Sequence, residues 1–304
     1  MNKSNNINRK IILNRKTKNY LIGYSFIAPN FIGFLVFTLI PILASLALSF
    51  CEWNGSTNIS FIGLENYKHM INNETFRISF LNTLYFSVFN IPLTMICALI
   101  VAVVLNNPLK GVNIFRAVYF FPYVCSIVAI TAVWNMLFNP DIGPVNYFLS
   151  QLGFRNLPRW SVSTKWAMPT VIMASIWKRS GYYMVIYLAG LQGIPNYLYE
   201  AAKIDGASTW QRFTKITIPM LTPTTFFVSI MVTIRSFQIF DLVYVMTEGG
   251  PGRATNVLSL NIYRSAFIDF EFGYASALAT VLFIIVAGIT IIQFRNQNKW
   301  VNYM

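Results

Sequence analysis

Residues 200–223 read EAAKIDGASTWQRFTKITIPMLTP, a polar and charged segment that lies between two apolar stretches. Each flanking stretch is long enough to cross a bilayer, because about 20 helical residues at 1.5 Å rise span the hydrocarbon core. The segment is therefore predicted to be a loop that contacts something outside the membrane.

The composition of the whole chain is that of a membrane protein. Of its 304 residues, 55% are hydrophobic and only 11% are charged, and long apolar runs recur along the chain. We therefore predict an all-α polytopic membrane protein with six transmembrane helices. The least apolar of these spans is the fourth, which contains Lys178 and Arg179. The predicted spans are residues 24–50, 82–105, 114–137, 166–190, 224–246 and 273–293.

Basic residues predict which side of the membrane each loop faces, because Lys and Arg next to spans are retained in the cytoplasm. With the N-terminus inside, thirteen of the 23 basic residues fall in cytoplasmic segments and seven in outer loops. Both termini and the 195–223 loop are therefore predicted to be cytoplasmic. The first apolar run is too long for a signal peptide and is expected to remain as a span. The predicted regions are a basic arm (1–19), a membrane domain (20–295) and a tail (296–304).

The formal net charge of +13 does not indicate nucleic-acid binding. Cations that bind phosphate backbones gather on one surface, whereas here they flank apolar spans. The basic arm is also expected to contact anionic lipid, at about 1 kcal/mol per basic residue. The cysteines are odd in number and two lie inside spans, so neither a disulfide framework nor a zinc site is predicted.

Motifs for nucleotide binding and proteolysis are absent from the sequence. There is no Gly-Lys pair and hence no P-loop, no HExxH and no GxSxG, and the only histidine is His69 in an outer loop. The chain is therefore not expected to be an enzyme or to bind a cofactor. Any ATP that drives it is expected on another subunit.

Local signals predict two short helices within the loop. Pro195 suits the first turn of one helix, and Gly206 stands where a left-handed C-cap is needed. Ser208 and Gln211 have the spacing of a capping box at the start of a second helix, whose continuation Pro219 is expected to hinder. The result is a tight turn at residues 205–207.

The predicted turn carries small side chains that allow another protein to approach the backbone closely. It also carries two carboxylates that can pair with basic residues of such a partner. An ordinary amphipathic connector in the membrane interface is the alternative. The residues predicted to dock a partner are Glu200, Ala201, Ala202, Asp205, Gly206 and Ala207.

The pattern of EAA, three residues, Gly and a run ending in I-x-x-P-x-x-x-P resembles the EAA loop of ABC importer permeases. Upstream, YLAGLQGIPNYLYEAA (187–202) is similar to the entry to that loop in the carbohydrate-uptake branch. Downstream, residues 240–279 resemble the stretch between the last two spans, and TEGGP (247–251) is similar to an element of the first permease of maltose, oligosaccharide and glycerol-phosphate systems. The resemblance covers roughly residues 20–295.

The resemblance implies a type I ABC importer permease fold in a bacterial plasma membrane and a set of partners. These are a second, homologous permease, a cytoplasmic ATPase dimer that binds ATP and Mg²⁺, and an extracytoplasmic solute-binding protein. It also implies that the loop is the coupling helix, with Glu200 and Gly206 as its most characteristic positions. Transport would then proceed by alternating access driven through this loop.

Polar residues within spans four and five predict a substrate path. Arg235 lies near the centre of the predicted fifth span, where a cation costs roughly 2.5–3.5 kcal/mol, so it is expected to face the interior or a water-filled cavity. Asp241 lies too far along the helix to be its ideal i,i+4 partner. The alternative for Arg179, in the outer half of span four, is that its side chain reaches for the lipid headgroups. The aromatic residues around it would then form an interface belt. The predicted path comprises Arg179, Tyr182, Arg235, Ser236 and Gln238.

Small residues in span six, Gly273 and Ala277 among them, predict close helix packing rather than solute contact. Two other classes of function stay open at this point. One is an importer subunit for a different solute, such as a polyamine, phosphate or peptide. The other is a stand-alone channel or secondary carrier, which needs no cytoplasmic partner.

Overall fold

The computed structural model describes residues 15–108 and 110–301. This part is helical except for two short antiparallel strands, β1 (Cys51–Glu52) and β2 (Ser60–Phe61), with Cys51 opposite Phe61. Most of the predicted basic arm and the last three residues of the predicted tail lie outside the described residues.

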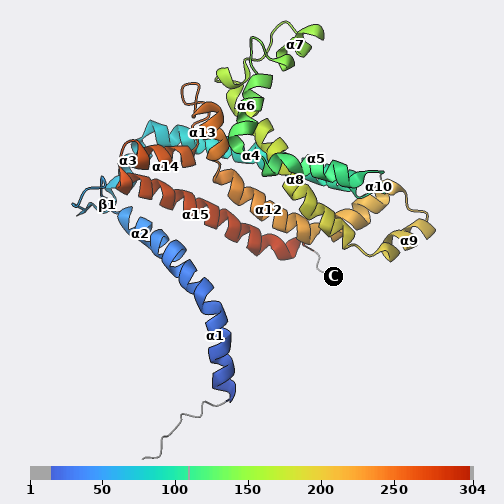
Figure 1. Cartoon of the computed structure of the whole chain (residues 1–304), viewed down its shortest axis with the longest axis horizontal. Helices are drawn as coiled ribbons and strands as arrows, with labels where there is room; N and C mark the ends of the chain where they lie inside the picture. Colours follow the sequence, from blue (N-terminus) through green and yellow to red (C-terminus); the bar gives the residue numbers. More distant parts are fainter. Residues whose placement is uncertain (1–14, 109, 302–304) are drawn as a thin grey trace, which may run out of the picture.

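The first span begins earlier than predicted. Helix α1 (Arg15–Phe34), the π turn η1 (Leu35–Leu39) and α2 (Ile40–Leu48) run on from one another. The π turn lies just before Pro41, which has no N–H to donate and crowds the preceding turn. This span extends away from the rest of the molecule (Figure 1), and none of its most apolar stretch is buried within the chain.

Four helices form the body of the molecule: α4 (Glu74–Leu105), α8 (Ala167–Gln192), α12 (Thr222–Phe237) and α15 (Phe272–Asn296). Ala98 and Ala102 of α4 are fully buried in one core cluster with Tyr187 of α8. Such small residues four apart let two helices approach closely in lipid. Asn90 of α4 also donates a 2.9 Å hydrogen bond to Ser236 of α12, inside the protein.

The predicted third span is broken rather than straight. Helices α5 (Val112–Val124) and α6 (Ile127–Leu137) meet at an angle of 100°. The backbone is extended at Cys125 and Ser126, three and four residues after Pro122. Beyond the break, α6 leads to α7 (Pro144–Gln151) and η2 (Trp160–Val162), and α7 stands apart from the body (Figure 1).

The predicted fifth span, 224–246, is also wrong as a single helix. Helix α12 ends at Phe237, and a separate helix, α13 (Asp241–Thr247), follows after three residues. The 16 residues of α12 are about 24 Å long, which is shorter than the hydrocarbon core. Arg235 therefore lies in the last turn of α12.

The remaining helices connect these elements. Helix α3 (Glu65–Asn72) precedes α4, and α14 (Leu258–Phe267) lies between α13 and α15. The 195–223 segment contains α9 (Asn196–Ile204), α10 (Thr209–Arg212), the π turn η3 (Phe213–Thr217) and α11 (Ile218–Met220). The 3-10 turn η4 (Gln297–Lys299) follows α15.

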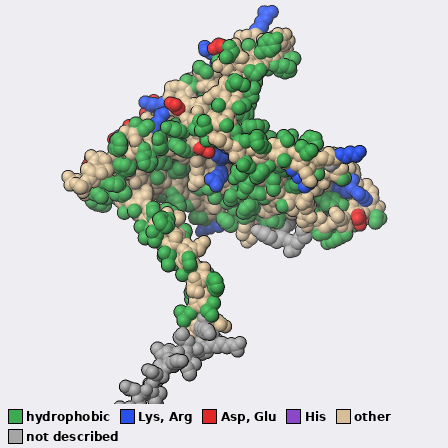
Figure 2. All heavy atoms as spheres, in the orientation of Figure 1, with side chains coloured by type: hydrophobic (Ala, Val, Ile, Leu, Met, Phe, Trp, Pro, Cys, Tyr) green, Lys and Arg blue, Asp and Glu red, His purple; other side chains and the backbone are tan. Residues whose placement is uncertain are grey.

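Length and composition identify three described helices that can each cross a membrane, or up to five spans if each bent pair counts as one. The three are the first span, α4 and α15. Helix α8 is not among them, although it has 26 residues, and it carries Lys178 and Arg179 near its middle. Figure 2 shows hydrophobic side chains over most of one face, with Lys and Arg gathered at the end that carries α9 and α10.

Candidate functional site

The turn at residues 205–207 has the caps that the sequence predicts. Gly206 adopts a left-handed φ of +75° directly after α9. Its N–H donates to Lys203 O at 3.1 Å, and the Ala207 N–H donates to Ala202 O at 2.8 Å. This pair of bonds is a Schellman motif, which satisfies carbonyls that α9 itself leaves free.

The second helix of the loop begins with the predicted capping box. The Gln211 N–H donates to Ser208 Oγ at 3.2 Å, and the Ser208 N–H donates to Gln211 Oε1 at 2.7 Å. The expectation that Pro219 would hinder this helix is not met, because the π turn η3 precedes it and the chain stays helical to Met220. The direction changes only at Leu221, where the chain bends by 63° into α12.

The loop presents an open surface. Glu200, Ala201, Asp205 and Gly206 are exposed, and a side chain at Gly206 would meet nothing within 4 Å. Ala202 and Ala207, which are half-buried, line a shallow groove of about 260 Å³ together with Asp205 and Gly206. The sequence prediction missed two apolar side chains beside them: Ile204 is 86% exposed and Trp210 is 71% exposed. Both side chains belong to the open surface of the loop.

The loop is firmly joined to the helices on either side. Tyr199 Oη and Thr217 Oγ1 lie 2.9 Å apart and link α9 to η3. A Cβ added at Gly190 would collide with the Thr224 side chain, so α8 and α12 approach closely where they enter and leave the loop. The loop is thus braced internally, and the two helices that it connects meet closely at its ends.

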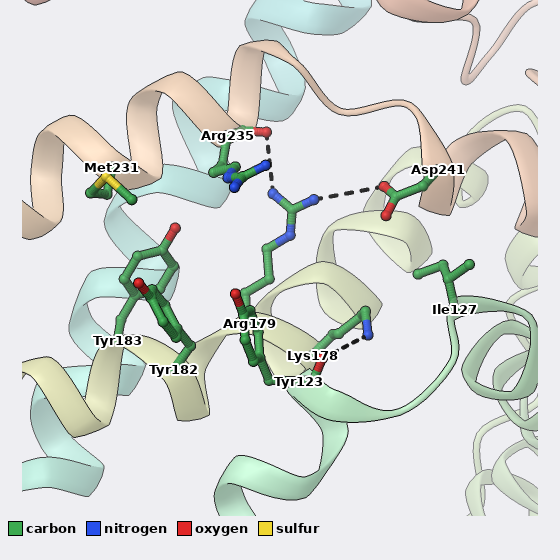
Figure 3. A pocket seen from close by; sticks show the side chains of 9 residues that line it. All are labelled: Tyr123, Ile127, Lys178, Arg179, Tyr182, Tyr183, Met231, Arg235 and Asp241. Carbon is green, nitrogen blue, oxygen red and sulfur yellow. Dashed lines mark hydrogen bonds and ion pairs between the residues drawn. The ribbon is translucent and has the colours of Figure 1, made fainter. Parts of the chain in front are cut away.

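A cavity of about 410 Å³ lies further along the same two helices (Figure 3). Its lining comes from five elements, α5, α6, α8, α12 and α13, and is rich in cations and tyrosines. The lining residues are Tyr123, Ile127, Lys178, Arg179, Tyr182, Tyr183, Met231, Arg235 and Asp241.

Arg179 is held in the cavity by two partners. Its guanidinium donates to the backbone carbonyl of Arg235 at 3.2 Å and lies 3.8 Å from Asp241 Oδ1. The Arg179 side chain is only 17% exposed, so it turns inward and does not reach for the headgroups. Asp241 was considered only as a partner for Arg235, but the break after α12 brings it to Arg179 instead (Figure 3).

Lys178 has a structural function beside the cavity. Its ammonium group donates to the carbonyls of Pro122, Tyr123 and Cys125 at 3.1, 3.4 and 2.9 Å. These carbonyls belong to the C-terminal end of α5, where the helix leaves them without partners and concentrates negative potential. A lysine within a span is thus explained by the broken helix that it caps.

The other predicted path residues do not all reach this cavity. Tyr182 lines it and stacks on Tyr123, with ring centroids 4.6 Å apart. Ser236 is fully buried and bonded to Asn90, away from the cavity. Gln238 lines a different, mostly apolar cavity formed with α14 and α15. The structure therefore brings together Arg179, Tyr182 and Arg235 and separates Ser236 and Gln238 from them.

A tight turn follows α13, and Gly273 of the predicted sixth span lies in close contact with the backbone. Glu248 and Gly249 adopt φ values of +50° and +80°, and Thr247 Oγ1 lies 2.8 Å from Thr255 Oγ1 across the turn. A Cβ at Gly273 would collide with the carbonyl of Cys51, so α15 approaches the β1 segment without space for a side chain.

A family model described as "Binding-protein-dependent transport system inner membrane component" matches residues 90–299, a region that includes both the loop and the cavity. The chain belongs to this family. This permease is therefore a multi-pass membrane component of a transport system that works with a binding protein.

Relatives and solved structures agree with this assignment. The permease is 41% identical over 290 residues to the probable ABC transporter permease YesP of Bacillus subtilis, covering 94% of this chain and 93% of YesP. It is 40% identical to the lactose transport permease LacF of Rhizobium radiobacter, covering 90% and 92% of the two chains. It shares its fold with a chain of a bacterial ABC transporter involved in alginate import, at a TM-score of 0.81 and 23% identity, covering 95% and 99% of the two chains.

Proposed function

We propose that this permease forms half of the membrane domain of an ATP-driven importer for a carbohydrate or a related glycerol-phosphate solute. The observation that carries the proposal is that one exposed, capped loop joins α8 and α12, the two helices that supply six of the nine residues lining the polar cavity. Relatives named for lactose, trehalose/maltose and sn-glycerol-3-phosphate transport, at 32–40% identity over most of the chain, support the solute class.

The proposed docking surface for the ATPase consists of Glu200, Ala201, Ala202, Asp205, Gly206 and Ala207. The open turn lets the partner approach the backbone, and neither of the two carboxylates forms an ion pair within the described part of the chain. ATP and Mg²⁺ would bind to that separate ATPase, and the permease itself would hold no cofactor. The loop and both chain termini would then lie in the cytoplasm, as the distribution of basic residues predicts.

The second partner in the proposal is a homologous permease. The first span contains an apolar stretch of 18 residues, none of which is buried by the rest of the chain. Lipid and a neighbouring subunit are the two surroundings that suit such a helix. The third partner, an extracytoplasmic binding protein, would deliver solute at the end of the molecule opposite the loop.

The geometry suits alternating access. Closure of the ATPase dimer would move the loop, and the contacts of Tyr199 with Thr217 and of Gly190 with Thr224 would carry that motion into α8 and α12. Both helices line the cavity, so their displacement changes which side of the membrane it faces. Arg179, Tyr182 and Arg235 would contact the solute; Ser236 would position α12 through Asn90, and Gln238 would lie outside the path.

The proposal is tested by purifying the tagged permease from its host. A second permease and an ATPase should co-purify with it, whereas a chain that is recovered alone would indicate a channel or secondary carrier. In proteoliposomes, Glu200→Lys and Gly206→Val should leave insertion intact but uncouple ATP hydrolysis from uptake. Gly193→Ala is the matched control, because Gly193 has an ordinary helical φ of −78° and space for a Cβ. Normal uptake by both loop variants would contradict the assignment of the docking surface.

A further inference from the structure

The cavity between α8 and α12 has more positive than negative charge. Lys178, Arg179 and Arg235 line it together with a single carboxylate, that of Asp241. A neutral sugar is recognised equally well by uncharged amides and hydroxyls, which avoid the large cost of placing cations at membrane depth. The excess of positive charge therefore needs a separate explanation.

Two of the three cations already have partners. Lys178 donates to three backbone carbonyls at the end of α5, and Arg179 is bonded to Asp241 and to the Arg235 carbonyl. The three donors of Lys178 are all used, and the charge of Arg179 is balanced by that of Asp241.

Arg235 differs from both. Within the described residues its guanidinium forms no ion pair and no hydrogen bond, and its side chain is exposed to the cavity. Figure 3 shows it beside the Arg179 guanidinium, which repels it electrostatically. A guanidinium presents several donors in a planar fork, and that geometry matches the two oxygens of a carboxylate or phosphate. An anion bound here would relieve the repulsion and satisfy the free donors together.

We propose, on the basis of the importer function above, that the cavity selects a negatively charged carbohydrate solute whose carboxylate or phosphate group binds Arg235. The stacked Tyr123 and Tyr182 rings lie in the same lining and offer an apolar face to the sugar ring. The Arg179–Asp241 pair holds the adjacent wall in place, which leaves Arg235 as the group that distinguishes acidic from neutral solutes.

The test measures direct binding to the purified assembly of both permeases and the ATPase in nanodiscs, without the binding protein. The probes are digalacturonate, its uncharged dimethyl ester, sn-glycerol 3-phosphate and glycerol. We expect at least one acidic probe to bind roughly ten- to hundredfold more tightly than its neutral counterpart, as for a hydrogen-bonded charge pair. The acid with the larger ratio identifies the anionic group as a carboxylate or a phosphate.

Variants of Arg235 test whether this residue causes the preference for acidic over neutral probes. Arg235→Gln should lower the affinity for the acidic probe to that of its neutral counterpart measured on the same variant, and Arg235→Lys should retain part of the preference. Arg77→Gln, the same substitution at an exposed arginine of α4 outside the cavity, should change neither affinity.

Three results would overturn the inference: equal binding of acidic and neutral probes, binding of neither, or loss of the second permease from Arg235→Gln preparations. The last result would mean that Arg235 pairs with a subunit instead of a solute. The proposed importer function fails on a different result, namely a wild-type chain that brings down no ATPase and no second permease.

Discussion

The 195–223 loop and the polar cavity lie on the same two helices but are held in shape by different kinds of contact. In the loop, the bonds that set the turn join residues three to five positions apart, as in the Schellman motif at Gly206 and the capping box at Ser208. In the cavity, Lys178 and Arg179 bond to groups more than fifty residues away.

This difference determines which substitutions should disturb each region. A local turn forms from its own segment and tolerates changes elsewhere, because its caps need no distant partner. The cavity exists only when α5, α8, α12 and α13 pack correctly, so a substitution at any of their contacts alters it. The following substitutions test this contrast through the free energy of unfolding of the purified permease.

The largest effect is expected for Gly181→Ala. The added Cβ would collide with the carbonyl of Tyr119, a backbone atom that cannot rotate away, so α5 must separate from α8. We expect a loss of about 3 kcal/mol in unfolding free energy, measured by equilibrium unfolding in mixed micelles. Gly288→Ala in α15 is the control, since a Cβ there meets nothing within 4 Å. Equal stability of the two variants would show that the α5–α8 contact is not needed.

A smaller effect, about 2 kcal/mol, is expected for Lys178→Met. The methionine fills a similar volume but leaves three carbonyls at the end of α5 without their charged donor. This loss is offset in part because the variant no longer has to bury a cation. Lys178→Arg should retain most of the stability. The free energy of unfolding of the two variants is measured in the same way. A Lys178→Met variant as stable as the wild type would contradict the capping function assigned to Lys178.

Asp241→Asn is expected to cost about 1 kcal/mol. The ion pair with Arg179 is 3.8 Å long and Asp241 is 54% exposed, so solvent screens much of the attraction. Asparagine can still accept the 2.9 Å hydrogen bond from the Leu242 N–H, so the start of α13 is preserved and the ion pair alone is tested. Dependence of the loss on salt concentration would confirm its electrostatic origin, whereas a salt-independent loss would not.

The smallest global effect is expected for Ser208→Ala. Loss of this N-cap weakens α10 by about 1 kcal/mol, but the loop is exposed and its caps are local, so global unfolding should change by less than about 0.5 kcal/mol. Hydrogen exchange of amides 209–212 should accelerate while amides in α8 remain protected. Faster hydrogen exchange of α8 amides in this variant would contradict the view that the loop is held by local contacts alone.

The same contrast decides how much the sequence alone could predict. The helices of the loop, its turn at residues 205–207 and its caps were predictable, because Gly206, Ser208 and Gln211 act on neighbours in the chain. The breaks at residues 125–126 and 238–240 were missed, because neither contains Gly or Pro and both depend on partners elsewhere. An aspartate in an apolar run, Asp241, was the available signal, since acidic residues favour helix N-termini.

Those missed breaks explain the errors in the predicted path. With the fifth span drawn as one helix, Arg235 was placed at its centre, and Ser236 and Gln238 were grouped with it. Arg235 and Ser236 are neighbours within α12 and point about 100° apart, toward the cavity and toward Asn90, whereas Gln238 lies beyond the end of the helix and faces α15. The π turn η3 ends two residues before Pro219, as η1 ends two residues before Pro41, so the proline was the available signal for both.

The uncovered first span has a consequence for biogenesis. A helix whose apolar stretch has no buried residue within its own chain inserts and persists through its contact with lipid, before any folding of the remainder. Synthesis of the permease in excess of its neighbouring subunits would therefore leave a stable, inserted helix without its protein contacts. The first span, Arg15–Leu48, would therefore depend for its protein contacts on balanced synthesis of the proposed partner subunits.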